Sequence, residues 1–337
     1  MQDDERYSRQ VLFSPIGEAG QEKLSAASVA VAGCGATGSF ICGLLARAGI
    51  GRLRIIDRDY AELSNLQRQS LFDEADAAES VPKAVAAARK IATFNSGVVV
   101  HPEVADLVPA NVEALLGGAQ LVLDGTDNFE TRFLINDFCV KNKVPWIYAA
   151  AVGAYGVTMN ILPGETACLA CLFPGAPGGD LETCDTAGIL NSAASMVASL
   201  AVTEALKILV GASPSLRRTL LSWNLWTNQR SEIATTRNPA CKVCGQFQFD
   251  HLGGKGRAQI TLCGRNSVQI HERQRQINFA EVSARLQPHG QVHHNDLILK
   301  FRHKEHEITL FPDGRAIIKG TTDPAVARSL YARFIGS

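Results

Sequence analysis

The nine residues Val31–Ser39, VAGCGATGS, decide the fold class of this chain. They follow a short apolar run, ASVAVA, and precede FICGLLARAG, which we expect to form a helix over residues 39–48. Gly33, Gly35 and Gly38 match G-x-G-x-x-G between a strand and a helix, the fingerprint of dinucleotide-binding folds. Such a loop brings backbone amides to a phosphate at a helix N-terminus, so it suits NAD, FAD or ATP equally.

Strand-like and helix-like segments alternate on both sides of this loop. We expect a helical arm over residues 1–25, strands over 28–33, 52–57, 98–104, 120–127, 144–152 and 219–223, and helices over 75–94, 111–116 and 132–143. This alternation predicts an α/β fold with a doubly wound, mainly parallel sheet. Ligands of such sheets sit at the carboxyl ends of the strands, where the glycine loop, Asp57 and Asp127 all fall.

Composition excludes several classes of protein. The formal net charge is zero and the pI is about 7.1, so bulk electrostatic binding of nucleic acid or of a membrane surface is not expected. The first ten residues, MQDDERYSRQ, are polar and do not resemble a signal peptide. The most apolar stretch, residues 192–211, carries Glu204 and Lys207 and is typical of a buried helix. We therefore expect a soluble, cytoplasmic protein.

A glycine-rich change of composition over residues 252–257 marks a linker. It divides the chain into a large domain over residues 1–252 and a small α/β domain over residues 258–337. In the small domain we expect a strand at 267–271, a helix at 279–286, a hairpin over 297–311 and a last helix that begins at Asp323-Pro324. Its scattered histidines predict a solvated surface, and it contains no catalytic constellation that we recognise.

Nine cysteines without an export signal do not favour disulfides. Four of them form two C-x-x-C pairs, Cys168 with Cys171 and Cys241 with Cys244, and this arrangement suggests a metal site. The separation between the pairs exceeds that of compact zinc ribbons, so unmetallated buried thiols are the alternative. Cys34 lies inside the glycine loop, where a small residue is required for packing.

Cationic residues distinguish the possible ligands of the loop. Arg68 lies within ELSNLQRQSLF, Lys83 follows SVP, and Asp127 lies in DGTDNFETR. A nucleoside triphosphate attacked by a carboxylate needs cations, because two anions approach each other and charge builds on the leaving pyrophosphate. The P-loop pattern G-x-x-x-x-G-K-[ST] does not occur in the chain.

Several motifs together resemble the ThiF/MoeB/HesA adenylyltransferases, the bacterial relatives of the ubiquitin-activating enzymes. They are RYSRQ, the glycine loop, DRDYAELSNLQRQ, Lys83, DGTDN and the paired C-x-x-C motifs, within about residues 1–250. The resemblance implies a Rossmann-like domain that uses ATP to adenylate the C-terminal Gly-Gly carboxylate of a ubiquitin-like sulfur carrier, ThiS or MoaD, with release of pyrophosphate. The product would serve thiamine thiazole or molybdopterin synthesis. The C-terminal segment is not part of the common core and does not resemble a rhodanese domain.

The resemblance also implies roles for matching positions. The nucleotide would be held by Gly33, Gly35, Ala36 and Gly38 at the phosphates, Asp57 at the ribose, Asn65, Arg68 and Lys83 at the triphosphate, and Asp127 at Mg²⁺ with Asn128 beside it. Arg9 of RYSRQ would reach the partner subunit's site, which implies a homodimer. The four paired cysteines would bind Zn²⁺, and a sulfurtransferase or cysteine desulfurase would be a further partner. The alternatives are surface ion pairs for Arg9 and Arg68 and an ordinary turn residue for Asp127.

Cys184, in LETCDTAGIL, matches the position of the reactive cysteine in this family. Its acidic neighbours Asp180, Glu182 and Asp185 would raise the pKa of its thiol. A covalent role in sulfur transfer is therefore weighed against a loop cysteine that adenylation does not need.

Two other functions compete with adenylation. A nicotinamide or flavin oxidoreductase could use the same loop, and it would bind NAD or FAD tightly. A non-catalytic, zinc-stapled module could bind a carrier protein without reacting. Arg9, Arg68, Lys83 and Asp127 are all present, which argues against a degenerate module.

Overall fold

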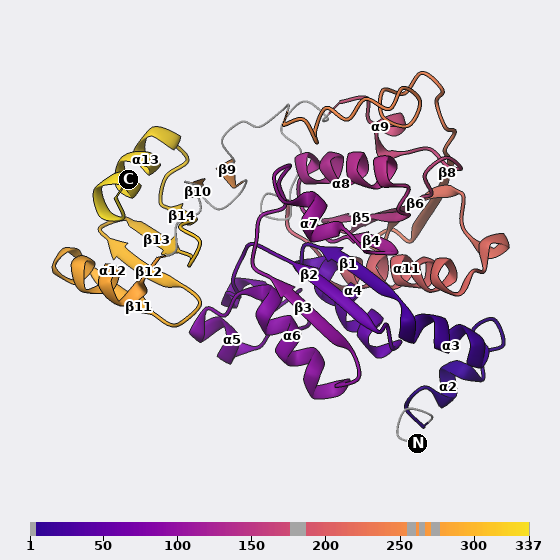
Figure 1. The fold of residues 1–337 in the computed structure, drawn as a ribbon, viewed down its shortest axis with the longest axis horizontal. Coiled ribbons are helices and arrows are strands. Elements are labelled where there is room, and N and C mark those ends of the chain that lie inside the picture. The colour runs from indigo at the N-terminus through magenta and orange to yellow at the C-terminus, as the bar shows by residue number, and fades with distance from the viewer. Residues whose placement is uncertain (1–4, 176–186, 255–260, 263–266, 271–276, 337) are drawn as a thin grey trace. The chain divides into compact units, whose positions relative to one another are not determined.

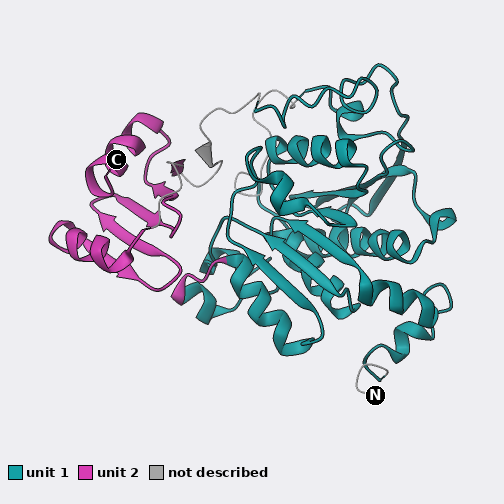
Figure 2. Cartoon of the chain, in the orientation of Figure 1, with its two compact units in different colours: residues 1–78, 83–255 teal, residues 79–82, 256–337 magenta. Residues whose placement is uncertain are grey.

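The computed structural model describes residues 5–175, 187–254, 261–262, 267–270 and 277–336. The chain forms two compact units, residues 1–78 with 83–255 and residues 79–82 with 256–337 (Figure 2).

An eight-stranded sheet forms the centre of the first unit (Figure 1). Its order is β3-β2-β1-β4-β5-β6-β7-β8. The strands are β1 Ser28–Ala32, β2 Arg52–Ile56, β3 Val99–Glu103, β4 Leu121–Asp124, β5 Trp146–Val152, β6 Tyr155–Ile161, β7 Thr219–Asn224 and β8 Gln229–Ala234. Neighbours from β3 to β5 are parallel, whereas β5 to β8 pair antiparallel. The predicted doubly wound, mainly parallel sheet is confirmed; β6 and β8 were not predicted.

Helices cover both faces of this sheet. They are α2 Ser8–Val11, α3 Gly17–Ala26, α4 Ala36–Arg47, α5 Glu74–Glu79, α6 Lys83–Phe94, α7 Val112–Leu116, α8 Phe129–Asn142, α9 Leu169–Leu172 and α11 Asn191–Val210. In Figure 1, α7 and α8 lie on one face, and α4 and α11 lie on the other. The large apolar cluster between α8 and the sheet includes Phe133, Phe138 and Trp146. This packing leaves the carboxyl ends of β1, β2 and β4 for the loops that carry the predicted site.

Two predicted helices differ from the structure. Helix α4 begins at Ala36 rather than Ser39, because the last glycine of the pattern lies inside its first turn. The predicted helix over 75–94 is two helices, α5 and α6. Ser80 between them has a φ of 52°, a left-handed conformation that ends α5, and Pro82 comes directly before α6, where its missing N–H costs no hydrogen bond. This break puts Lys83 at the first turn of a new helix.

Helix α11 is long and apolar enough to cross a membrane by length and composition. It packs against α4, β5 and β6 within the first unit. Its buried face consists mostly of alanine and valine, and Glu204 on that face is 3 % exposed. The predicted buried helix is thus confirmed.

The described part of the second unit is a six-stranded antiparallel sheet with the helices α12 Phe279–Leu286 and α13 Pro324–Phe334. The strands are β9 Thr261–Leu262, β10 Ser267–Ile270, β11 Gln291–His294, β12 Leu299–His303, β13 His306–Leu310 and β14 Ala316–Lys319. Asp323 caps α13 by accepting a hydrogen bond from the Ala325 N–H at 2.8 Å, as its Asp-Pro sequence predicts. The predicted hairpin is β12 with β13. Alternate residues of the strands form an apolar core with α12 and α13.

Candidate functional site

The glycine loop makes close backbone contact with the loop that follows β4. Gly33 has a φ of +85°, and a Cβ on it would lie 2.6 Å from the carbonyl oxygen of Gly125. A Cβ on Gly38 would lie 2.0 Å from the Gly33 oxygen. Gly125 has no more room, since its own Cβ would lie 2.7 Å from the Gly38 Cα. These three glycines therefore join the loop after β1 to the loop after β4.

Gly35 is the N-cap of α4, and it has no side chain that could accept hydrogen bonds from the first amides of the helix. The first amides of a helix have no intrahelical acceptor, and together with the helix dipole they favour an anion. The turn is fixed by the Ser39 N–H, which donates to the Gly35 oxygen at 3.0 Å. This helix terminus can accept a phosphate at the predicted position.

Asp57 follows β2 and is 8 % exposed. Its Oδ2 accepts a hydrogen bond from the Cys34 N–H at 2.6 Å, and its Oδ1 accepts one from the Asp59 N–H at 2.7 Å. Burial raises the pKa of Asp57, while the nearby Lys83 ammonium acts in the opposite direction. The carboxylate thus holds the glycine loop in place, and its remaining lone pairs could accept the hydroxyl of a ribose.

Lys83 is 2 % exposed, and its Nζ lies 3.3 Å from the Asp59 Oδ2. The Lys83 N–H also donates to the Asp59 carbonyl oxygen at 2.8 Å. A buried ammonium needs a nearby anion, and Asp59 supplies one next to Asp57. The structure therefore brings together Asp57 and Lys83, which are far apart in the sequence.

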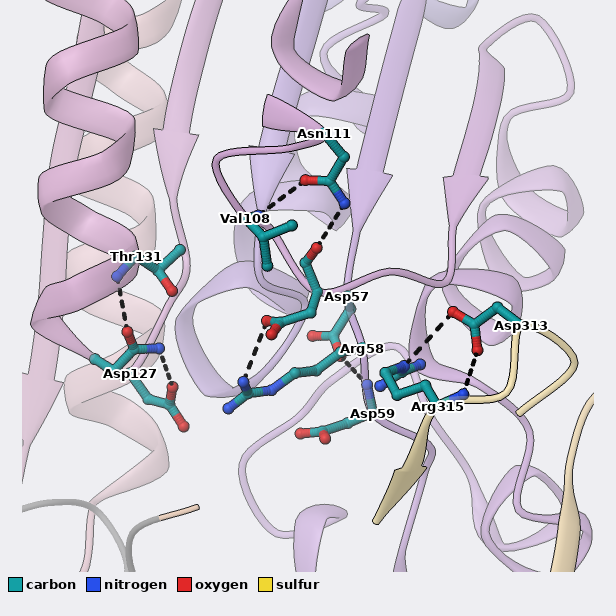
Figure 3. A network of polar contacts seen from close by, with 11 residues as sticks. Asp57, Arg58, Asp59, Val108, Asn111, Asp127, Thr131, Asp313 and Arg315 are labelled. Atoms are coloured by element: carbon teal, nitrogen blue, oxygen red, sulfur yellow. Dashed lines mark hydrogen bonds and ion pairs between the residues drawn. The ribbon is translucent and has the colours of Figure 1, made fainter. Parts of the chain in front are cut away.

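A second polar contact holds the loop after β3 beside these residues. Arg58 Nη1 lies 3.2 Å from Asp106 Oδ1, and Asn111 Nδ2 donates to the Asp106 carbonyl oxygen at 2.8 Å. Asn111 Oδ1 accepts the Val108 N–H, as Figure 3 shows. Burial alone would lower the pKa of Arg58, but the surrounding carboxylates, Asp106 foremost, raise it. Sequence patterns did not predict Arg58 or Asp106 as site residues.

Asn65 and Arg68 belong to the turn that begins with the 3₁₀ helix η1, Leu63–Asn65. Asn65 is 1 % exposed, and its Oδ1 accepts the Glu62 N–H at 3.2 Å, so it caps the turn. Arg68 is half-buried, and its Nη1 donates to the Ser64 carbonyl oxygen at 2.7 Å. No carboxylate of the described residues forms an ion pair with Arg68. The other N–H groups of the Arg68 guanidinium could therefore donate to an anion.

Asp127 is exposed after β4, next to the helix α8. Asn128 caps α8 by accepting the Thr131 N–H at 2.8 Å, and its Nδ2 donates to Asp127 Oδ1 at 3.3 Å (Figure 3). Asp127, the predicted Mg²⁺ ligand, thus lies beside Asn128 at the end of a strand whose loop contacts Gly33.

A buried ion pair lies beneath this loop, and sequence patterns do not predict it. Asp124 is fully buried and accepts hydrogen bonds from the Thr126 N–H at 2.8 Å and from Arg132 Nε at 2.9 Å. Arg132 Nη2 donates to the Thr126 carbonyl oxygen at 2.6 Å. The two charged residues flank the predicted motif within DGTDNFETR, which was the available indication. They fix the loop that carries Asp127 and Asn128.

The arm that carries Arg9 docks at the other end of α4. Tyr7 lies against Gly49, and its hydroxyl accepts a hydrogen bond from Asn95 Nδ2 at 2.8 Å. Gln10 Nε2 donates to the Ala48 carbonyl oxygen at 2.9 Å. Helix α4 has 12 residues and is about 18 Å long, so these contacts lie far from the glycine loop. The exposed Arg9 therefore does not join the site of its own chain.

Comparison with known proteins identifies the family. The model of the ThiF family matches residues 7–243. The chain belongs to the ThiF family.

Relatives of this ThiF family member carry related names. The sulfur carrier protein ThiS adenylyltransferase of Bacillus subtilis is 43 % identical over 98 % of this chain and 99 % of its own length. The sulfur carrier protein adenylyltransferase of Thermus thermophilus is 36 % identical over 72 % of this chain and 90 % of its own length. A crystal structure of E. coli MccB with ATP has a TM-score of 0.62 at 25 % identity, over 71 % of this chain and 74 % of MccB. The Bacillus relative matches both units, whereas the other two match less than three quarters of the chain.

The paired cysteines of this ThiF family member meet in space. The sulfurs of Cys168, Cys171, Cys241 and Cys244 all lie within 4.8 Å of one another. Neighbouring sulfurs are 3.3–3.9 Å apart, close to the separation of about 3.8 Å that a tetrahedral zinc thiolate site requires. The Asn238 N–H lies 3.5 Å from the Cys171 sulfur. Both the donor set and its spacing fit a tetrahedral metal ion.

Asp137 of α8 binds the backbone that follows the second C-x-x-C pair. It is fully buried, and its Oδ2 accepts the His251 N–H at 2.9 Å. Burial raises the pKa of Asp137 to about 7.

The raised pKa of Asp137 predicts a pH-dependent stability. The folded chain holds this proton more tightly than the unfolded chain, so the stabilisation is full at low pH and is lost between about pH 4 and 7. We expect the free energy of unfolding to fall by up to about 1.4 kcal/mol per pH unit in this window, relative to Asp137→Asn. Urea unfolding of both proteins from pH 5 to 8 measures the difference. Parallel pH profiles of the two proteins would contradict it.

Cys184 lies outside the described residues, as do its acidic neighbours. The structure places ten of the predicted residues around one edge of the sheet: Gly33, Gly35, Ala36, Gly38, Asp57, Asn65, Arg68, Lys83, Asp127 and Asn128. Arg9 and the four paired cysteines lie elsewhere in the described chain.

Proposed function

We propose that this chain uses ATP to adenylate the C-terminal carboxylate of a ubiquitin-like sulfur carrier protein. The observation that carries the proposal is the gathering of an open helix N-terminus, the buried Lys83, and Arg68 and Asp127 at one edge of the sheet. The names of the Bacillus and Thermus relatives support it. The pattern suits a triphosphate better than a dinucleotide, because a dinucleotide carries less charge to neutralise.

In the proposed reaction, a carboxylate oxygen of the carrier attacks the α-phosphorus of ATP. The new bond is a mixed anhydride, and the bond between the α-phosphorus and the bridging oxygen breaks, so pyrophosphate leaves with the electron pair. The attacking carboxylate is already ionised at pH 7, and no general base is required. Lys83 and Arg68 neutralise the charge that builds on the leaving group, and the amides after Gly35 orient the phosphates.

The other site residues would position the nucleotide. Asp57 would bind the ribose, and Asn65 would keep the turn that presents Arg68. Asp127, with Asn128 beside it, would hold Mg²⁺, which adds positive charge near the phosphates when it is bound. Arg9 would enter the site of a second copy of this chain, so the active form would be a homodimer.

The four paired cysteines would bind one structural Zn²⁺. We expect about one zinc per chain in protein purified without chelator, and loss of the metal in Cys171→Ser with an unfolding temperature lower by about 5–10 °C. Metal analysis and thermal unfolding measure both. Cys42→Ala, which alters a buried thiol outside the cluster, should keep its zinc. Wild-type protein with well under one zinc per chain would contradict the site.

Sulfur delivery would follow adenylation, with Cys184 as the covalent residue and a sulfurtransferase or cysteine desulfurase as donor. The carrier would be of the ThiS or the MoaD type, for thiamine thiazole or molybdopterin synthesis. None of the seven described cysteines forms a disulfide, which fits a reducing compartment such as the cytoplasm.

Exchange of labelled pyrophosphate into ATP tests the proposed function. We expect exchange that depends on a ThiS-like or MoaD-like carrier and disappears when the last glycine of the carrier is removed. Tight NAD or FAD binding without exchange would favour an oxidoreductase. Carrier binding without exchange would favour a non-catalytic module.

A further inference from the structure

Gly35 differs from the other two glycines of the pattern by the space around it. A Cβ on Gly33 or Gly38 would collide with backbone at 2.0–2.6 Å. Among the described residues, a Cβ on Gly35 would have a single neighbour within 4 Å, the Gln69 Nε2 at 3.9 Å. The side chain that borders this space is therefore an uncharged amide.

The side-chain oxygen of Gln69 is buried without a hydrogen bond to the described residues, and no described residue accepts a hydrogen bond from its Nε2. Gln69 is 4 % exposed, and its Oε1 is buried with no partner in this part of the chain. Its backbone is nevertheless firmly held, because the Gln69 N–H donates to the Asn65 oxygen at 3.0 Å and the next amide, of Ser70, donates to Ser39 Oγ at 3.1 Å. The amide thus faces the glycine loop by backbone placement.

A buried amide oxygen without a hydrogen-bond donor is rare, since the cost of its desolvation is not offset. Here the unpartnered group borders the space above a helix N-terminus that can accept a phosphate. A triphosphate in this space would bring oxygen acceptors for the Nε2 hydrogens. Water bound beside the phosphates would bring O–H donors for Oε1. A neutral amide can make these contacts without adding charge next to Lys83 and Arg68.

We propose that Gln69 is a further nucleotide-binding residue, whose Nε2 donates a hydrogen bond to a phosphate oxygen of ATP seated at Gly35. This inference rests on the proposed function in one respect, that the ligand is ATP. Gln69 takes no part in bond making; it binds and orients the phosphate chain.

The test compares ATP affinity with stability in the absence of nucleotide and carrier. Gln69→Leu keeps the approximate size of the side chain and removes both polar atoms. We expect its ATP affinity, measured by calorimetry, to be about tenfold to a hundredfold weaker, because hydrogen bonds to charged groups are strong. Its unfolding temperature without nucleotide should be unchanged or higher, since an unsatisfied buried acceptor is removed. Adenosine should bind both proteins equally, because it carries no phosphate.

Two further variants sharpen the result. Gln69→Glu places a carboxylate beside the phosphates, so its loss of ATP affinity should be at least as large and should decrease as salt increases. Gln67→Leu alters an exposed glutamine of the same turn and should bind ATP as the wild type does.

A Gln69→Leu protein that stays folded and binds ATP within twofold of the wild type would overturn the proposal. So would a Gln69→Leu protein that loses ATP and adenosine affinity alike, since the effect would then be structural. If Gln69→Leu does not fold, Gln69→Glu decides the question by the same comparison. Because no carrier is present, a failure of carrier adenylation leaves this result intact, whereas wild-type protein that binds no ATP refutes both.

Discussion

Arg68→Ala is expected to lower carrier-dependent pyrophosphate exchange by about a hundredfold to a thousandfold, because a donor aimed at developing charge is removed. The same change should leave stability nearly unaltered. Arg68 is half-buried and donates to a single backbone oxygen, and no described carboxylate loses its partner when the guanidinium is removed. Exchange kinetics and thermal unfolding of the same preparation measure the two effects.

Arg89→Ala is the matched control for this prediction. Arg89 is an exposed arginine of α6, the helix that Lys83 begins, so its loss changes net charge equally without touching the nucleotide edge. We expect wild-type exchange in this variant. Full exchange by a folded Arg68→Ala protein would show that the triphosphate is held by other cations.

Mixed dimers test the proposal that Arg9 acts across subunits. Arg9→Ala and Lys83→Ala are each expected to be nearly inactive alone. Co-expressed in equal amounts, they should recover about a quarter of wild-type exchange, since half of the randomly paired dimers would contain one intact site. We expect this recovery because the arm docks at the end of α4, about 18 Å from the glycine loop of its own chain.

The mixture has a clear opposing outcome. If Arg9 acted within its own chain, every site of a mixed dimer would lack one residue, and activity would stay at the level of the separate variants. Full activity of Arg9→Ala alone would assign the arm a structural role. Purified heterodimers, separated by two different tags, remove any dependence on random pairing.

The parallel strands could be predicted because they are short apolar runs that end at polar turns. Strand β8 could not, since all six of its residues are exposed and it exists through pairing with β7 at the edge of the sheet. Its sequence, QRSEIA, carries no alternation that a buried face would impose. Strand order and edges are properties of the assembled sheet.

The placement of residues at the edge of the sheet could be predicted where residue type and motif agree, as at Lys83 and at Asp127 with Asn128; their roles stay predictions. The two C-x-x-C pairs predicted a metal site, but only folding brings Cys168 to within 3.7 Å of Cys241. Sequence patterns assigned Asp57 to the ribose and missed that it first binds the Cys34 and Asp59 amides. Sequence patterns do not predict the proposed role of Gln69, because that role is inferred from a buried side-chain oxygen without a partner in the described chain.

The contact of Gly33 and Gly38 with Gly125 explains why the glycine fingerprint is shared by enzymes of different chemistry. Two of its three glycines are required because a Cβ would collide with neighbouring backbone, whatever the ligand. Of the three, only Gly35 borders the space where a ligand would lie. A sequence search with this pattern therefore finds proteins that join two loops in the same way, whatever ligand they bind. Discrimination among NAD, FAD and ATP has to come from positions outside the fingerprint, and a search profile that weighted those positions would separate the chemistries.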